Sequence, residues 1–294
     1  QTPAGARPSS AERQAVKTRK ACARSFYPEA SAPTIEEYVR GFAPPALPGA
    51  CAAVAPHAGW FFSGRTAARV FLTLAPAAPA TLVLLGAVHR RPLEGPAVDA
   101  AQAWDTPLGP VAVDTALLAD LRQADMGLEF DRDAHEGEHS IEVSLPFVRH
   151  FLPEARIVPI ACPTFPGAPA FGAALGAALK GRRAVVVASS DLTHYGASYG
   201  SAPLSGDSAQ TLRLVRENDE RMLALVRELR DDAILAEARA RHNACGGGAI
   251  AAAVAAARTM GARAGIVIEY RTSHDSLPEH PITRIVGYGG VVMA

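Results

Sequence analysis

The feature of this sequence that most restricts its fold is a series of short, uninterrupted apolar segments separated by stretches of helical character. The segments span residues 51–55, 81–86, 156–160, 184–189, 265–270 and 285–293, and the helical stretches span 64–74, 140–151, 171–180, 208–229 and 245–260. Strands without polar alternation are typical of a sheet covered on both faces. The pattern therefore predicts an α/β fold with a central, mostly parallel or mixed sheet flanked by helices.

Length and composition fit one domain of this kind. The chain has 294 residues, of which 49% are hydrophobic and 20% charged, so it is not a disordered polypeptide. Residues 1–18 are polar and aperiodic, which predicts a flexible N-terminal arm. We expect residues 19–294 to form a single α/β domain.

The charge balance and the apolar runs argue against two classes of partner. Lysine and arginine total 29, as do aspartate and glutamate, so the chain lacks the basic excess of a nucleic-acid binder or of a protein held on anionic membranes. No apolar run reaches the roughly 18 residues of a spanning helix, and the first residues lack an apolar leader. The four cysteines share no tight spacing. We expect a cytoplasmic protein with reduced cysteines.

Polar residues follow several of the predicted strands. His57 and His89 come after the first two strands, and Asp191 and His194 come after the fourth. In α/β folds, ligands bind at the carboxyl ends of the strands. A lone histidine at such a position is more often a hydrogen-bonded structural residue, but three at equivalent positions predict a shared site.

Two of these histidines and one cysteine have the chemistry of a metal site. Two imidazoles and a thiolate, from His57, His89 and Cys245, suit zinc, iron(II) or copper and leave a coordination position open. Glycines after Cys245 lead into a helix, whose N-terminus favours a thiolate; the alternative is a small packed residue. Asp191 and His194 are spaced as an acid/base pair, unless Asp191 only caps a turn.

Two rival motifs are weaker. His135, Glu138 and His139 match the H-x-x-E-H pattern of an inverted zinc protease, but Gly137 weakens the required helix. We favour an interpretation in which His139 and Glu142 open a helix facing the same cleft. Ser190, Asp191 and His194 lie in one short loop without a G-x-S-x-G elbow, and neighbours in a loop seldom align as a triad.

Several segments, in this order, resemble the Memo family. PHAGWFFSG resembles its PHAGYxYSG segment, LLGAVHRRP its LGPSH turn, and EHSIEVSLPFV its EHSxE segment. VVVASSDLTHYG and NACGGGAI resemble its SSDxxH and CG segments, and RKACARSFYPEA, DTPLGPVAVD and IVGYGGVV its AGxFYP, hairpin and closing-strand elements. The resemblance runs from about Arg19 to Met293 and is nearest to the bacterial branch called AmmeMemoRadiSam system protein B.

The resemblance implies a fold like that of class III, LigB-type extradiol dioxygenases. Those enzymes hold non-haem iron with two histidines and a carboxylate, and the Memo family has a cysteine in place of the carboxylate. Carried onto this chain, the ligands are His57, His89 and Cys245, with Asp191 and His194 in the SSDxxH segment. The resemblance also implies iron or copper and redox chemistry. A human relative is described as a phosphotyrosine-peptide binder, and the bacterial name implies a radical-SAM pathway partner.

This chain departs from the family pattern at several positions. Ala87 and Val88 replace Pro-Ser before the second histidine, and Arg90 follows it. Trp60 and Phe62 replace tyrosines, which removes two hydroxyl groups that could meet a substrate. The expected ligands are intact, so these changes bear on the identity of the substrate.

The sequence leads us to expect a metal-dependent oxidoreductase acting with O₂ on a small aromatic substrate. Iron(II) is the first choice of metal, copper the second and zinc the third. His194 would be the acid/base, oriented by Asp191, and His139 would face the substrate. Two alternatives stay open: a metal-binding module for a peptide or protein partner, and a zinc hydrolase with His194 as base.

Overall fold

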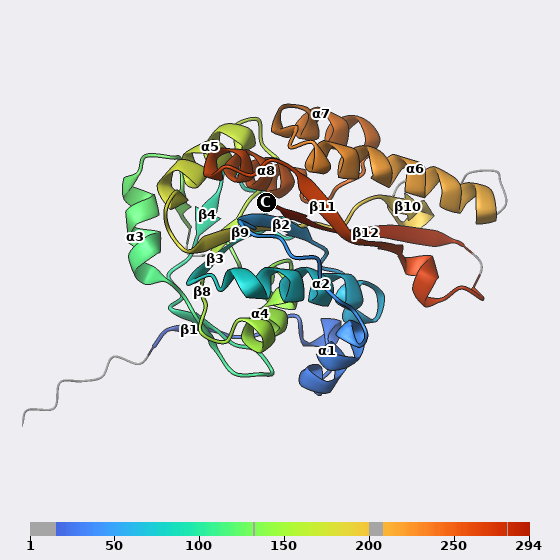
Figure 1. The fold of residues 1–294 in the computed structure, drawn as a ribbon, viewed down its shortest axis with the longest axis horizontal. Coiled ribbons are helices and arrows are strands. Elements are labelled where there is room, and N and C mark those ends of the chain that lie inside the picture. Colours follow the sequence, from blue (N-terminus) through green and yellow to red (C-terminus); the bar gives the residue numbers. More distant parts are fainter. Residues whose placement is uncertain (1–15, 132, 200–207, 281) are drawn as a thin grey trace, which may run out of the picture.

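A large sheet lies between two layers of helices (Figure 1). The computed structural model describes residues 16–131, 133–199, 208–280 and 282–294. Helices α5, α6, α7 and α8 lie on one side of the sheet, and α1, α2 and α4 lie on the other (Figure 1). This arrangement confirms the predicted α/β class.

The sheet is mixed, with a parallel centre. Among the described residues nine strands form it, in the order β10-β12-β2-β9-β3-β8-β4-β7, with β11 on β12. Strands β2, β9, β3 and β8 run parallel, and β12 and β11 add antiparallel pairs. The strands are β2 (Ala52–Ala55), β3 (Thr81–Gly86), β4 (Ala97–Val98), β7 (Glu129–Phe130), β8 (Arg156–Ala161), β9 (Ala184–Ser189), β10 (His194–Gly196), β11 (Gly265–Thr272) and β12 (Arg284–Met293).

A second, smaller sheet ties the start of the described chain to the domain. Strand β1 (Thr18–Arg19) runs parallel to β5 (Ala103–Trp104), which pairs antiparallel with β6 (Val111–Ala112). Residues 1–15 of the expected flexible arm lie outside the described residues. Thr18, which the sequence assigned to that arm, pairs with Ala103 instead.

Alternate residues of the central strands point to opposite faces of the sheet and pack into two separate hydrophobic cores. Val54, Leu85 and Val186 pack on the side of α5 (Ala168–Leu179) and α8 (Gly247–Met260). Their neighbours, among them Leu84 and Val187, pack on the side of α2 (Trp60–Leu74) and α4 (Leu145–Phe151). Both faces are therefore buried, which explains why the strands read as continuous apolar runs.

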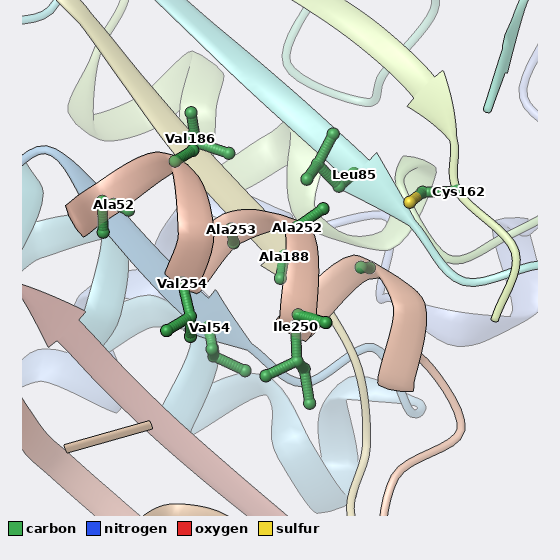
Figure 2. Packing of buried hydrophobic residues seen from close by; sticks show 14 of the residues in the cluster. Ala52, Val54, Leu85, Cys162, Val186, Ala188, Ile250, Ala252, Ala253 and Val254 are labelled. Carbon is green, nitrogen blue, oxygen red and sulfur yellow. The ribbon is translucent and has the colours of Figure 1, made fainter. Parts of the chain in front are cut away.

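Small residues let α8 approach both the sheet and α5. Ile250, Ala252, Ala253 and Val254 of α8 lie over the central strands (Figure 2). A Cβ atom on Gly172 of α5 would collide with the backbone of Ala252. The alanine-rich run near the C-terminus is thus a buried helix whose narrow profile sets a close helix–helix distance.

The structure differs from the sequence-based prediction in its helices. The helix expected over 140–151 begins as a turn, continues as a 3₁₀ segment (Glu142–Ser144) and becomes helical only at α4. The sequence pattern did not reveal α1 (Ser31–Val39), α3 (Thr115–Gln123) or α7 (Asp231–Arg241), whereas α6 (Ser208–Arg227) was expected. None of the helices in the described part of the chain has the length and apolar character to cross a bilayer.

Asp219 is a fully buried carboxyl group that α6 directs towards the sheet. It accepts hydrogen bonds from the Thr193 N–H at 2.8 Å and the Tyr270 hydroxyl at 2.7 Å. Burial raises the pKa of Asp219 to about 6, although hydrogen bonds from Thr193 and Tyr270 oppose the shift. The ionised carboxylate therefore costs the folded state stability.

We expect the Asp219→Asn variant to remove a pH dependence of stability. A carboxyl group with a raised folded-state pKa contributes most stability below its unfolded pKa and loses that contribution as pH rises through about 6. Relative to the variant, the wild type should lose about 2 kcal/mol of unfolding free energy between pH 4 and pH 7. Urea unfolding at several pH values measures this. Exposed Asp120→Asn is the control, and a difference between wild type and Asp219→Asn that does not vary with pH would contradict the expectation.

Candidate metal centre

Three side chains with metal-binding atoms meet at the carboxyl edge of the sheet. His57 follows β2, His89 follows β3, and Cys245 lies just before α8. Strand β9 lies between β2 and β3, so the two histidines flank its end. The ligand atoms of the three residues all lie within 4.8 Å of one another. The sequence predicted this grouping from strand ends and from the family resemblance.

The His57 ring is held with one nitrogen towards the cluster. Ser189 Oγ donates to the Ser140 carbonyl at 2.5 Å and must therefore accept from His57 Nδ1, which lies 2.8 Å away. The proton is thus on Nδ1, and the lone pair is on Nε2. Burial lowers the pKa of His57 to about 4, despite the opposing charge of Asp191, so the ring is neutral near pH 7.

The His89 ring is fixed in the same tautomer by a carboxylate. Its Nδ1 donates to Glu138 Oε1 at 3.1 Å, and its backbone N–H donates to Glu138 Oε2 at 2.6 Å. Burial raises the pKa of Glu138, but hydrogen bonds from His89 and the Ser140 N–H outweigh it and hold that pKa well below its usual value. A histidine whose Nδ1–H is bonded to a carboxylate presents Nε2 to a metal.

Cys245 completes the set as a half-buried thiol. Its Sγ lies 3.4 Å from His57 Nε2 and accepts the Asp191 N–H at 3.3 Å. Burial, and then the charge of Asp191, raise the pKa of Cys245 to about 12. Burial therefore opposes the thiolate that the helix N-terminus was expected to favour. A bound cation would reverse this balance and stabilise the thiolate.

Asp191 and His194 form hydrogen bonds to different partners, whereas the members of an acid/base pair were expected to bond to each other. Asp191 Oδ1 accepts the backbone N–H groups of His57 at 2.8 Å and Ala58 at 3.3 Å, so this carboxylate fixes the loop that carries His57. His194 Nδ1 lies 3.0 Å from the Leu192 carbonyl. The Leu192 carbonyl orients the His194 ring, and Asp191 supports the metal-ligand loop.

His139 joins the cluster and His135 does not. The His139 ring lies 5.4 Å from that of His57 and 5.0 Å from that of His89, centroid to centroid. Burial lowers its pKa. His135 packs on Trp104 at 5.0 Å, and residues 133–137 form a turn, not a helix. The H-x-x-E-H segment is therefore not a protease helix, and Glu138 orients His89.

A cavity of about 700 Å³ opens beside His57 and His89 of the cluster. His139 and His194 line it beside His57 and His89. Four aromatic residues and two arginines also line the cavity: Phe26, Phe62, Tyr199, Tyr288, Arg90 and Arg284. The site can therefore admit a small organic molecule next to the ligand cluster.

Glu138, Ser189 and Glu142 are functional residues that the sequence reasoning missed in these roles. Glu142 accepts hydrogen bonds from Arg19 at 2.7 Å and from the Tyr27 hydroxyl at 2.9 Å, which fixes the N-terminal segment beside the site. The signal was the EHSxE segment, whose two glutamates lie four residues apart. The first of these glutamates, Glu138, also belongs to the H-x-x-E-H pattern, which hides its role beside His89.

Comparison with known proteins agrees with this geometry. The model of the family described as Memo-like protein matches residues 19–292. The chain belongs to the Memo family. A MEMO1 family protein of Pyrococcus abyssi is 34% identical over 286 residues, covering 93% of this chain and 98% of the relative. One from Methanopyrus kandleri is 36% identical over 257 residues, covering 85% and 84% respectively. All three ligand residues fall inside the region that matches the Memo family.

We expect Glu138→Gln to weaken metal binding without abolishing it. The amide keeps an oxygen for the backbone N–H groups but loses the charge that holds His89. Changes to such outer partners cost about 10- to 100-fold in metal affinity. Competition with a chromophoric chelator measures the dissociation constant. Glu136→Gln, on an exposed turn, is the control, and an unchanged affinity in Glu138→Gln would exclude this role.

Proposed function

We propose that this protein is a cytoplasmic, mononuclear metal-dependent oxidoreductase that acts with O₂ on a small aromatic substrate. Iron(II) is the first choice of metal and copper the second. The observation that carries the proposal is the three-ligand cluster of His57, His89 and Cys245 beside an open cavity. Membership of the Memo family supports the metal-binding part of it.

The donor set fits a redox-active metal. Two imidazoles with Nδ1 already engaged present Nε2, and a thiol that accepts the Asp191 N–H can supply a thiolate. Three protein ligands leave coordination positions towards the cavity. When bound, iron or copper would supply a Lewis acid and electron transfer to O₂.

The chain's own residues would orient the substrate and move protons. His194 lines the cavity with Nδ1 beside the Leu192 carbonyl, and its ring would accept a substrate proton. His139 lines the cavity together with the two ligand rings; its lowered pKa keeps it neutral and able to accept a proton. Phe26, at 4.5 Å from the His139 ring, shields that side from water.

Replacing His194 separates metal binding from turnover. Wild type and His194→Gln, purified without air and loaded with iron(II), are mixed with a panel of catechols in aerated buffer, and O₂ uptake is followed with an electrode. We expect equal metal content and a turnover rate lower by about 10²- to 10⁴-fold in the variant.

Zinc-loaded wild type is the matched control, because it keeps the ligand geometry without a redox-active ion. Uptake of O₂ that persists after complete removal of metal would overturn the proposal. Normal iron binding with no O₂ uptake by the wild type for any phenolic substrate would favour the peptide- or partner-binding module. Hydrolysis of ester substrates by the zinc form alone would favour the zinc hydrolase.

A further inference from the structure

A second cluster of charged side chains lies behind the metal cavity, between α2 and β11. Arg65 and Arg69 of α2 both contact Glu269 Oε1, at 3.1 Å and 2.9 Å. Thr66 donates its hydroxyl to the other oxygen of Glu269 at 3.0 Å. Arg271, two residues further along β11, faces the same cavity as Arg65 and Arg69. One carboxylate is therefore shared by several guanidinium groups.

The positive charge in this cluster is not balanced. Arg271 donates from Nη2 to the Asp275 carbonyl at 3.0 Å, while its Nε is buried and has no hydrogen-bond partner among the described residues. Burial lowers the pKa of Arg69, and the neighbouring charges of Arg65 and Arg271 lower it further against the effect of Glu269. Such a cluster gains stability from an added negative charge.

The arginines surround a cavity of about 330 Å³. Glu37 of α1 and Arg40 at its C-terminal end line the same space, so four arginines there face two carboxylates, those of Glu37 and Glu269. Phe62 lines both this cavity and the metal cavity, and Phe61, 62% exposed, stands at the entrance. The arginine cavity is thus distinct from the metal cavity, and the two share Phe62 as a lining residue.

We propose that this arginine cavity binds an oxyanion, as a phosphate or carboxylate group carried by a small molecule. The planar guanidinium groups of Arg65 and Arg271 offer forked N–H donors that match the oxygen spacing of both groups. The carboxylate of Glu269 would repel the bound anion and so limit the affinity of the site, although it also holds Arg65 and Arg69 in place.

The test compares two substitutions with opposite expected effects. Inorganic phosphate and succinate are titrated separately into the full-length protein at constant ionic strength, and heat is measured by calorimetry. Arg271→Gln should weaken binding about tenfold or more, because a charge-assisted donor is lost. Glu269→Gln should tighten binding, because the competing negative charge is removed. The anion that binds more tightly to the wild type identifies the group that the site takes.

Two controls locate the binding. Arg284→Gln, in the metal cavity, and Arg182→Gln, paired with Asp120 at 3.0 Å elsewhere on the surface, should leave the affinity unchanged. Arg65→Gln, whose side chain is 44% exposed, is a second variant that should also weaken binding if Glu269→Gln fails to fold. Absence of saturable binding of either anion, equal affinities in wild type and Arg271→Gln, or loss of binding in Arg284→Gln would overturn the proposal.

Discussion

Cys245→Ala is expected to lower the affinity for a divalent metal by at least about hundredfold. The thiolate is the only charged ligand in the cluster of His57, His89 and Cys245, so its loss removes both a bond and the charge that offsets the cation. The measurement is elemental analysis of protein purified without air and dialysed against buffer lacking metal. The wild type should hold about one metal ion per chain, and the variant should hold almost none.

Matched variants make this result specific. His57→Ala should lose metal to the same degree, because its Nε2 lies beside Cys245 Sγ. Cys51→Ala should keep the wild-type content, since Cys51 contacts the carbonyl groups of Ala257 and Met293, away from the cluster. Equal metal in wild type and Cys245→Ala, or no uptake by the wild type on titration, would show that these residues do not form a metal centre.

Gly248→Ala is expected to disrupt both the fold and the metal centre. A Cβ atom on Gly248 would overlap the backbone carbonyl of Pro163, which follows β8, and backbone atoms cannot rotate away. Overpacking of this kind costs about 3 kcal/mol or more. Because Gly248 lies three residues after Cys245, the displaced start of α8 should also move the thiol out of reach of His57. Urea unfolding and metal titration measure the two effects.

Gly95→Ala is the control for this substitution. The nearest atom to its added Cβ would be 4.0 Å away, so its stability and metal affinity should match those of the wild type. A Gly248→Ala protein with wild-type stability would mean that α8 can shift away from Pro163 without loss. Lower stability with unchanged metal affinity would mean that the thiol is held by the loop and not by the start of the helix.

The strands and the ligand positions could be predicted because they depend on local sequence. Strands β3 and β9 have the bounds that their apolar runs predicted, since each run is buried on both faces. His57 and His89 follow such strands directly, and parallel neighbours place them at one edge. Helix α3 was missed because only Leu117 and Leu121 of its nine residues are buried, which leaves a weak periodic signal.

The supporting contacts could not be predicted, because they depend on distant parts of the chain meeting. Glu138 reaches His89 across 49 positions of sequence, and although the EHSxE segment marks the glutamate, it does not indicate which residue the glutamate contacts. The protonation of Cys245 likewise follows from its burial and from the nearby Asp191 charge, which only the assembled fold brings together. Sequence reasoning therefore found the ligand types but not the groups that set their tautomers and pKa values.

The ligands also come from opposite ends of the polypeptide, 188 positions apart for His57 and Cys245. During synthesis the ribosome would release β2 and β3 long before the cysteine that completes the set. A nascent chain would therefore present only two imidazoles and bind metal weakly until α8 has emerged and packed on the sheet. If the three residues bind a metal, the order of the elements would therefore delay tight binding until the chain is almost complete.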